Sequence, residues 1–257
     1  MTRTFNLLTP ILLLISFNIS AQNVKFATEG VIEFERNTNL HAIIKKRMAK
    51  DDNGFSKQIY ESLLKNQPQF RVSKSTLYFS GNKTLFKPDG EEVPIPYFGN
   101  DATMSQINNI FMDLTTSQQV TQKKVYEETF LLTDSTRKIN WKITSETRDI
   151  AGYTCRRANA LVMDSIYVVA FYTDEIPVSS GPESFNGLPG MILGVALPHE
   201  NTTWFAKSVT DKVIAGNVVV APSKGKKTDI KGLTTTLKDA LKNWGSEIQT
   251  ALKAYLL

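Results

Sequence analysis

The chain has 257 residues, of which 41% are apolar and 21% charged, and it carries a formal net charge of +5. This ordinary composition excludes wholesale disorder and fibrous repeats. One cysteine excludes a disulfide framework and a cysteine-rich metal site, and the two histidines lack metal-ligand spacing, so composition predicts neither a metal nor another cofactor.

Residues 1–21 have the pattern of a secretory signal peptide. Arg3 precedes an apolar run over residues 5–19, and Ala21 ends a short segment suited to cleavage. A membrane anchor is the rival interpretation, but residues such as Asn6 and Pro10 interrupt a run that would need about 20 apolar residues. Cleavage near Ala21 predicts a periplasmic or secreted chain with a net charge of +4 and no later transmembrane segment.

The remaining basic residues are spread along the chain, apart from a short run over residues 224–227. A nucleic-acid-binding protein usually has a stronger basic stripe with aromatic residues between the charges. We therefore expect no nucleic-acid partner and interpret this run as a solvated linker, with weak contact to anionic lipid headgroups as the alternative.

The first half of the mature chain alternates between strand and helix signals. Residues 31–36 alternate apolar and charged side chains, which predicts a strand with Ile32 and Phe34 on its dry face. Residues 39–66 then show three- and four-residue spacing, which predicts two helical pieces interrupted near residues 51–54. Gly81-Asn82 lies between two alternating segments, 77–80 and 83–86, and predicts a hairpin.

The second half predicts further strands joined by short turns. They are expected at residues 125–132, 139–143, 153 onward, 166–172, 191–197, 203–209 and 213–220. The run over residues 166–172 is apolar throughout, so both faces of its strand should be covered. Tight connections favour an antiparallel meander. An apolar stripe from Leu237 to Tyr255 predicts one helix of about 20 residues, either docked on the sheet or lying at a membrane surface.

Several motifs in order resemble the GLPGLI family, secreted proteins of the Bacteroidetes. The matching segments are residues 147–158, residues 171–177, Gly181-Pro182 and residues 187–192, where Met191 replaces the leucine of the family name. The resemblance implies an exported envelope protein without an established activity. The strand order also resembles the half-barrels of bacterial lipoprotein carriers, and the family resemblance further implies kinship with bowl-shaped N-terminal domains of certain bacterial N-glycanases.

The expected fold class is therefore α+β. It comprises a curved antiparallel meander sheet, a lipoprotein-carrier-like half-barrel, with an N-terminal helical insertion and a C-terminal amphipathic helix. The expected division is a signal peptide over residues 1–21, a GLPGLI-type β domain over residues 22–222, and a linker with the C-terminal helix over residues 223–257.

The glycine-rich signature suits a tight corner of the sheet. Pro189 and Gly190 fit the central positions of a type II turn, with Gly190 at positive φ. The same loop is a candidate lip of an apolar pocket, because loops on rigid sheets commonly bind ligands. The candidate lip residues are Gly181, Pro182, Gly187, Leu188, Pro189, Gly190, Met191 and Ile192. The candidate lining residues are Trp141, Tyr153, Tyr167 and Phe171, for which core packing is the alternative.

No catalytic constellation emerges from the sequence. Cys155 lacks a recognisable partner base and is expected to be a buried thiol. Glu33 with Glu35, and Asp174 with Glu175, are pairs that any solvated strand or loop can contain. The leading hypothesis is a non-catalytic module that binds an apolar or amphipathic ligand, such as a lipid or glycan, or an envelope protein. A hydrolase of glycans or peptides and a structural accessory of an outer-membrane complex remain the alternatives.

Overall fold

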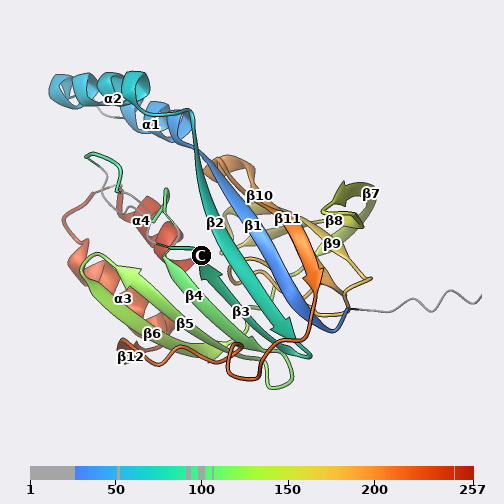
Figure 1. The fold of residues 1–257 in the computed structure, drawn as a ribbon. Helices are drawn as coiled ribbons and strands as arrows, with labels where there is room; N and C mark the ends of the chain where they lie inside the picture. Colours follow the sequence, from blue (N-terminus) through green and yellow to red (C-terminus); the bar gives the residue numbers. More distant parts are fainter. Residues whose placement is uncertain (1–26, 51–52, 91–93, 98–101, 106, 246) are drawn as a thin grey trace, which may run out of the picture.

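A computed structural model describes residues 27–257 except 51–52, 91–93, 98–101, 106 and 246. The predicted signal peptide, residues 1–21, lies outside the described residues. The described part contains one large curved sheet that does not close, with four α-helices (Figure 1). The predicted fold class, a curved antiparallel sheet with helices near both ends of the chain, is confirmed.

Twelve strands make up the sheet in the order β12-β6-β5-β4-β3-β2-β1-β11-β10-β9-β8-β7. All neighbouring pairs are antiparallel except β12 with β6. The strands are β1 (Glu29–Asn39), β2 (Phe70–Ser80), β3 (Lys83–Pro88), β4 (Asn108–Asp113), β5 (Gln118–Val125), β6 (Glu128–Ser135), β7 (Lys142–Ile150), β8 (Tyr153–Val162), β9 (Ile166–Thr173), β10 (Met191–Leu197), β11 (Thr202–Asp211) and β12 (Lys226–Thr228). The sheet is therefore a meander whose first strand, β1, lies in its middle.

The alternation in β1 defines the two faces of the sheet. Ile32 and Phe34 are fully buried on the inner, concave face, whereas Glu33 is exposed on the outer face. Most of β9 is buried, as its continuous apolar run predicts. The Gly81-Asn82 hairpin joins β2 to β3, and Gly81 has φ +54°.

Two helices follow β1, as predicted: α1 (Leu40–Met48) and α2 (Gly54–Asn66). Each begins after an asparagine, Asn39 or Asn53, whose side chain accepts a hydrogen bond from a main-chain N–H of the first turn. Both helices extend beyond the end of the sheet (Figure 1). This arrangement places α1 beside the concave face at the point where β1 ends.

The predicted single C-terminal helix is wrong, because the segment forms two helices. They are α3 (Ile230–Ala240) and α4 (Glu247–Leu256), and Gly245 between them has φ +57°, a left-handed conformation that interrupts a helix. Leu233 and Leu237 of α3 pack in one apolar cluster with Leu252 and Tyr255 of α4, against the inner face of β5 and β6. Trp244, which the predicted stripe included, is about half exposed.

Three predicted strands differ from the observed ones. Residues 125–132 contain the turn between β5 and β6, with Tyr126 at φ +52°. Of residues 139–143, only the last two belong to a strand. Residues 213–220 form no strand; Val219 packs on the outer face against Phe111 and Leu131. The basic run over residues 224–227 leads into β12, and the division at residue 223 stays a prediction.

The inner face of the β8–β10 part of the sheet is filled by the connection between β9 and β10, residues 174–190, which we call the filling loop. Ile176, Val178, Phe185 and Leu188 of this loop are each at most 3% exposed. They pack against the inner side chains of the sheet, so this region of the concave face is a continuous core.

Candidate functional site

A hollow remains at the other part of the concave face. It lies between α1, α4, residues 102–105 and 107–108, and the ends of β1 and β11, next to the 3-10 helix η1 (Pro198–Glu200). We call it the Trp204 pocket. It holds about 970 Å³ of empty space including its open mouth. The cavity proper has a volume of about 100 Å³, and its lining combines apolar side chains with a few polar groups, as is common in sites for small ligands.

Arg36 and Trp204 form the floor of this pocket. They face each other across the β1–β11 register, and the Arg36 guanidinium carbon lies 5.3 Å from the centre of the Trp204 ring. Phe185 of the filling loop packs edge-on against Trp204 at 6.4 Å. Both Arg36 and Trp204 are at least 95% buried, so the guanidinium–indole contact is removed from bulk water, where such contacts are strongest.

Helix α1 and the segment around Thr103 form one wall. Arg36 Nη2 donates a hydrogen bond to the Thr103 carbonyl oxygen at 3.1 Å, and Arg47 Nη2 donates to the Thr103 hydroxyl at 3.2 Å. Lys46 Nζ donates to the carbonyl oxygen of His199 in η1 at 3.2 Å. These bonds connect elements far apart in sequence and fix the shape of the pocket.

A second wall carries a buried carboxylate that the sequence analysis missed. Glu183 of the filling loop is 6% exposed, and its Oε2 accepts a hydrogen bond from Asn108 Nδ2 at 2.7 Å. Glu183 has φ +52°, a left-handed conformation that is uncommon for residues other than glycine. Backbone strain of this kind often accompanies a functional site.

Three buried polar groups of the lining lack a hydrogen-bond partner among the described residues. They are Trp204 Nε1, Ser105 Oγ and Asn108 Oδ1. Most buried polar groups in folded proteins are paired, and an unpaired one costs about 1–3 kcal/mol. One donor, one acceptor and one hydroxyl are therefore buried and unpaired among the residues that line the pocket.

A second hollow, which we call the Lys123 pocket, lies next to the first on the inner face of β4–β6. It holds about 1110 Å³ including its mouth. Asn108 and Leu257 line both hollows, so the end of α4 separates them. In Figure 1 this end of the chain lies within the concavity of the sheet.

A buried lysine, Lys123, and a half-buried arginine, Arg137, hold the end of α4 in this position. Lys123 Nζ donates a hydrogen bond to the Tyr255 carbonyl oxygen, and Arg137 Nη2 donates to that of Leu256 at 2.6 Å. Ser184 Oγ of the filling loop donates to the Leu257 oxygen at 3.0 Å.

Burial shifts the pKa values of both cations in this cluster. Burial lowers the pKa of Lys123 to about 8; the negative charge of Glu183 acts in the opposite direction, and the positive charge of Arg137 adds to the lowering. Burial also lowers the pKa of Arg137. The end of α4 thus accepts hydrogen bonds from two cations, and removing the charge of each from water is unfavourable.

The predicted lip residues lie in and around the filling loop. Gly181, Pro182, Leu188, Gly190, Met191 and Ile192 are buried, and Gly187 and Pro189 are exposed. None of the eight lines the Trp204 pocket, whereas Glu183, which lies between them in the chain, does. Whether any of the eight binds a ligand stays a prediction.

The predicted positive φ at Gly190 is wrong, because the left-handed glycine of this signature is Gly187, at φ +91°. Gly190 is required for a different reason. A Cβ atom at this position would lie 2.0 Å from the Thr173 main-chain oxygen. Main-chain hydrogen bonds from Met191 to Ile176 and from Ile192 to Ser180 fix the loop onto β10. The signature therefore forms a tightly packed corner.

The four predicted aromatic lining residues do not come together. Trp141 donates from Nε1 to the Asn186 carbonyl oxygen at 2.8 Å, and Tyr153 packs against the main core. Phe171 alternates with the inner residue Tyr172 and lies on the outer face, where its ring centre is 6.3 Å from that of Phe205 and the two rings are tilted by 38°.

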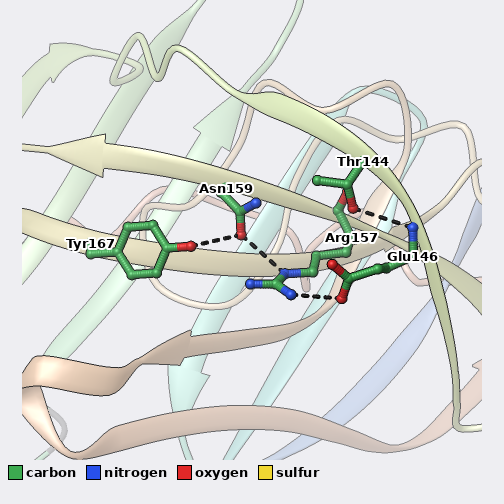
Figure 2. A network of polar contacts seen from close by, with 5 residues as sticks. All are labelled: Thr144, Glu146, Arg157, Asn159 and Tyr167. Atoms are coloured by element: carbon green, nitrogen blue, oxygen red, sulfur yellow. Dashed lines mark hydrogen bonds and ion pairs between the residues drawn. The ribbon is translucent and has the colours of Figure 1, made fainter.

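The remaining predicted aromatic residue, Tyr167, joins a polar network on the outer face (Figure 2). Arg157 Nη1 and Glu146 Oε2 are 2.6 Å apart, and Arg157 Nε donates to Asn159 Oδ1 at 3.1 Å. The Tyr167 hydroxyl donates to the same oxygen at 3.2 Å. Glu146 belongs to the edge strand β7, so this network ties that edge to β8 and β9.

The groups considered for catalysis are dispersed. Glu33 accepts a hydrogen bond from Ser208 and Glu35 lies 3.5 Å from Lys207, both on the outer face. Cys155 is fully buried, and burial raises its pKa to about 12, so the thiol is not ionised at neutral pH. Among the described residues, no cluster of three or more His, Cys, Asp or Glu is suited to hold a metal.

Comparisons with known proteins bear on the family and the fold. Residues 161–194, which include the glycine-rich signature, match the family described as "Protein of unknown function (Porph_ging)". A search of curated proteins found no match to the sequence. The match covers a short part of the chain, so it is a likeness over the end of β8, β9, the filling loop and the start of β10.

The curved sheet resembles that of PNGF-II in two crystal forms. The C2 form superposes with a TM-score of 0.51, at 16% identity over 85% of this chain, and the P21 form with a TM-score of 0.50, at 18% identity over 86%. The chain spans about a third of the length of PNGF-II, 33% and 34% respectively. These likenesses show the fold. Within the described residues, no helix combines the length and the apolar character needed to cross a membrane.

Proposed function

We propose that the protein is an exported, non-catalytic binding module that takes an apolar or amphipathic ligand into the Trp204 pocket. Export is inferred from the signal pattern of residues 1–21. The binding role is inferred from the hollow beside the end of α4, in a sheet whose concave face is packed by the filling loop beneath β8–β10. A lipid, a glycan with an apolar part, or a segment of an envelope protein has this character.

The observation that carries the proposal is the chemistry of the lining. Apolar side chains, among them Ile43, Ile166 and Leu197, surround the pocket, while Trp204 Nε1, Ser105 Oγ and Asn108 Oδ1 are buried in it without partners among the described residues. An apolar body with a few polar atoms satisfies both kinds of surface. A scaffold without a ligand gains nothing from keeping such groups buried and unpaired.

The test uses N-phenyl-1-naphthylamine, a neutral probe that fluoresces in apolar surroundings. Titration into the protein should give saturable binding at one site. Ala254 of α4 lines the pocket, so the substitution Ala254→Trp should fill it and weaken probe binding at least tenfold. Ala240 is exposed at the end of α3, so Ala240→Trp is the matched control.

The two outcomes of this titration are distinct. Loss of binding in the Ala254→Trp variant alone supports the proposed function. Equal binding in both variants, or no saturable binding to the unaltered protein, overturns it. Circular dichroism of each variant verifies that the sheet is retained, so that loss of binding is not mistaken for unfolding.

A further inference from the structure

The mouth of the Trp204 pocket gathers positive charge from two helices that are far apart in the chain. Five cationic side chains line the pocket: Arg36, Lys46, Arg47, Lys50 and Lys253. Among the described residues, two carboxylate side chains line the pocket, Glu183 and Glu200, so the cationic side chains outnumber them by three. The whole chain has a net charge of only +5, so the pocket concentrates much of the excess.

These charges follow a gradient from the mouth to the floor. Lys46 and Lys50 are exposed, Lys253 is half-buried, and Trp204 at the floor is 4% exposed. Lys46 lies in the last turn of α1 and Lys50 lies just beyond the end of this helix, and both line the pocket. Lys253 lines the same pocket from α4.

Among the described residues, the hydrogen bond of Lys46 at this mouth is made to a neutral group. The Lys46 ammonium group donates to a main-chain carbonyl, that of His199, which carries no formal charge. The buried carboxylate Glu183 is 6% exposed and is engaged by Asn108, so it lies below the mouth. A ligand that enters the pocket therefore meets positive charge first and apolar surface afterwards.

We propose that the ligand of the Trp204 pocket is an anionic amphiphile, whose acidic head group lies at Lys46, Lys50 and Lys253 and whose apolar part lies over Trp204. This inference rests on the proposed function and adds the charge and the orientation of the ligand. A carboxylate, a phosphate and a sulfate share the required chemistry, because each accepts hydrogen bonds from ammonium groups.

The expected preference is modest, because exposed charge pairs contribute little individually. Three such pairs together should favour an anionic head group over a neutral one by about tenfold. The preference should weaken in concentrated salt, because the screening length falls from about 10 Å at 0.1 M to about 3 Å at 1 M.

The experiment displaces N-phenyl-1-naphthylamine with ligands that share a twelve-carbon chain and differ in the head group. They are dodecanoate, dodecyl phosphate, neutral dodecyl maltoside and cationic dodecyltrimethylammonium, each used below its micelle concentration. We expect the two anions to compete about tenfold better than the neutral compound, and the cation to compete worst. Inorganic phosphate alone should compete far less than dodecyl phosphate.

Lysine variants test the orientation. The triple substitution Lys46→Gln, Lys50→Gln and Lys253→Gln should abolish the preference for anions, measured within this variant as the ratio of competition by dodecyl phosphate to competition by dodecyl maltoside. The control triple Lys45→Gln, Lys57→Gln and Lys238→Gln removes the same charge from exposed positions that do not line the pocket, and it should retain the preference.

The results separate the two proposals. Probe binding with equal competition by anionic and neutral compounds overturns the anionic assignment and leaves the proposed function standing. Equal loss of preference in both triples also overturns it, because the effect is then one of overall charge. Inorganic phosphate competing as well as dodecyl phosphate contradicts an amphiphilic ligand. Absence of saturable probe binding overturns the proposed function itself.

Discussion

The two ends of the concave face differ in what covers them. Beneath β8–β10 the protein's own filling loop packs tightly, with Phe185 and Leu188 each 1% exposed. Beneath β1 and β4–β6 the cover consists of α1, α3, α4 and residues 102–105 and 107–108, which leave two hollows. One sheet thus carries a packed core at one end and a polar, partly open cavity at the other.

The residues of the glycine-rich signature therefore lie at the packed end, and the residues that line the Trp204 pocket lie at the hollow end. The signature glycines allow close packing, whereas the hollow end buries long polar side chains such as Arg36 and Lys123. Burial of charge is unfavourable unless partners are supplied, so it is expected where function requires it. We therefore place the binding proposal at the hollow end.

The largest effect is expected for Gly190→Ala in the packed end. The added methyl group would meet the Thr173 oxygen, so the connection between β9 and β10 must shift, at a cost of about 3 kcal/mol in the free energy of unfolding. Urea denaturation followed by circular dichroism measures this. Gly54→Ala, with no atom within 4 Å of its Cβ, should change stability by less than about 1 kcal/mol. Equal effects would contradict the close packing.

A second prediction concerns pH and the hollow end. The pKa of Lys123 is about 8 in the folded protein against an ordinary 10.5. Between these values the unfolded chain binds more protons, so the unfolding free energy should rise with pH relative to the Lys123→Met variant. Below pH 8 the full cost of burying the charge is present.

The measurement compares urea unfolding of both proteins at pH 7 and pH 10. The stability difference should move by about 2 kcal/mol in favour of the unaltered protein at the higher pH. Lys124→Met, which alters an exposed neighbour in the same strand, should show a difference that is independent of pH. If the stability difference between the unaltered protein and Lys123→Met is also independent of pH, the Lys123 ammonium group is hydrated in the folded protein.

The smallest effect is expected on the outer face, at the network of Figure 2. The Arg157–Glu146 pair is largely solvated on its Glu146 side, and exposed ion pairs typically contribute about 0.5 kcal/mol. A double-mutant cycle with Arg157→Gln and Glu146→Gln measures the coupling energy by urea unfolding. A coupling above about 2 kcal/mol would show that this edge of the sheet depends on the network as much as on its core.

Two residues of the hollow end, Arg36 and Lys123, could have been recognised from the sequence. Arg36 occupies the same face of β1 as Ile32 and Phe34, and Lys123 shares its face of β5 with Val125. A charged residue at a core-facing position is uncommon and usually has a special role. Glu183 left no such signal, because its loop has no periodicity.

Local secondary structure was determined by the sequence itself. Alternation in β1, helical spacing over residues 39–66 and the Gly81-Asn82 turn each depend on interactions between neighbours in the chain, so pattern and turn chemistry suffice to predict them. Tertiary structure alone decided that residues 174–190 fill the concavity and that α1 and α4 both line the pocket above Trp204. These contacts join residues up to about 200 positions apart, and their stability depends on packing and solvent exclusion that no local pattern encodes.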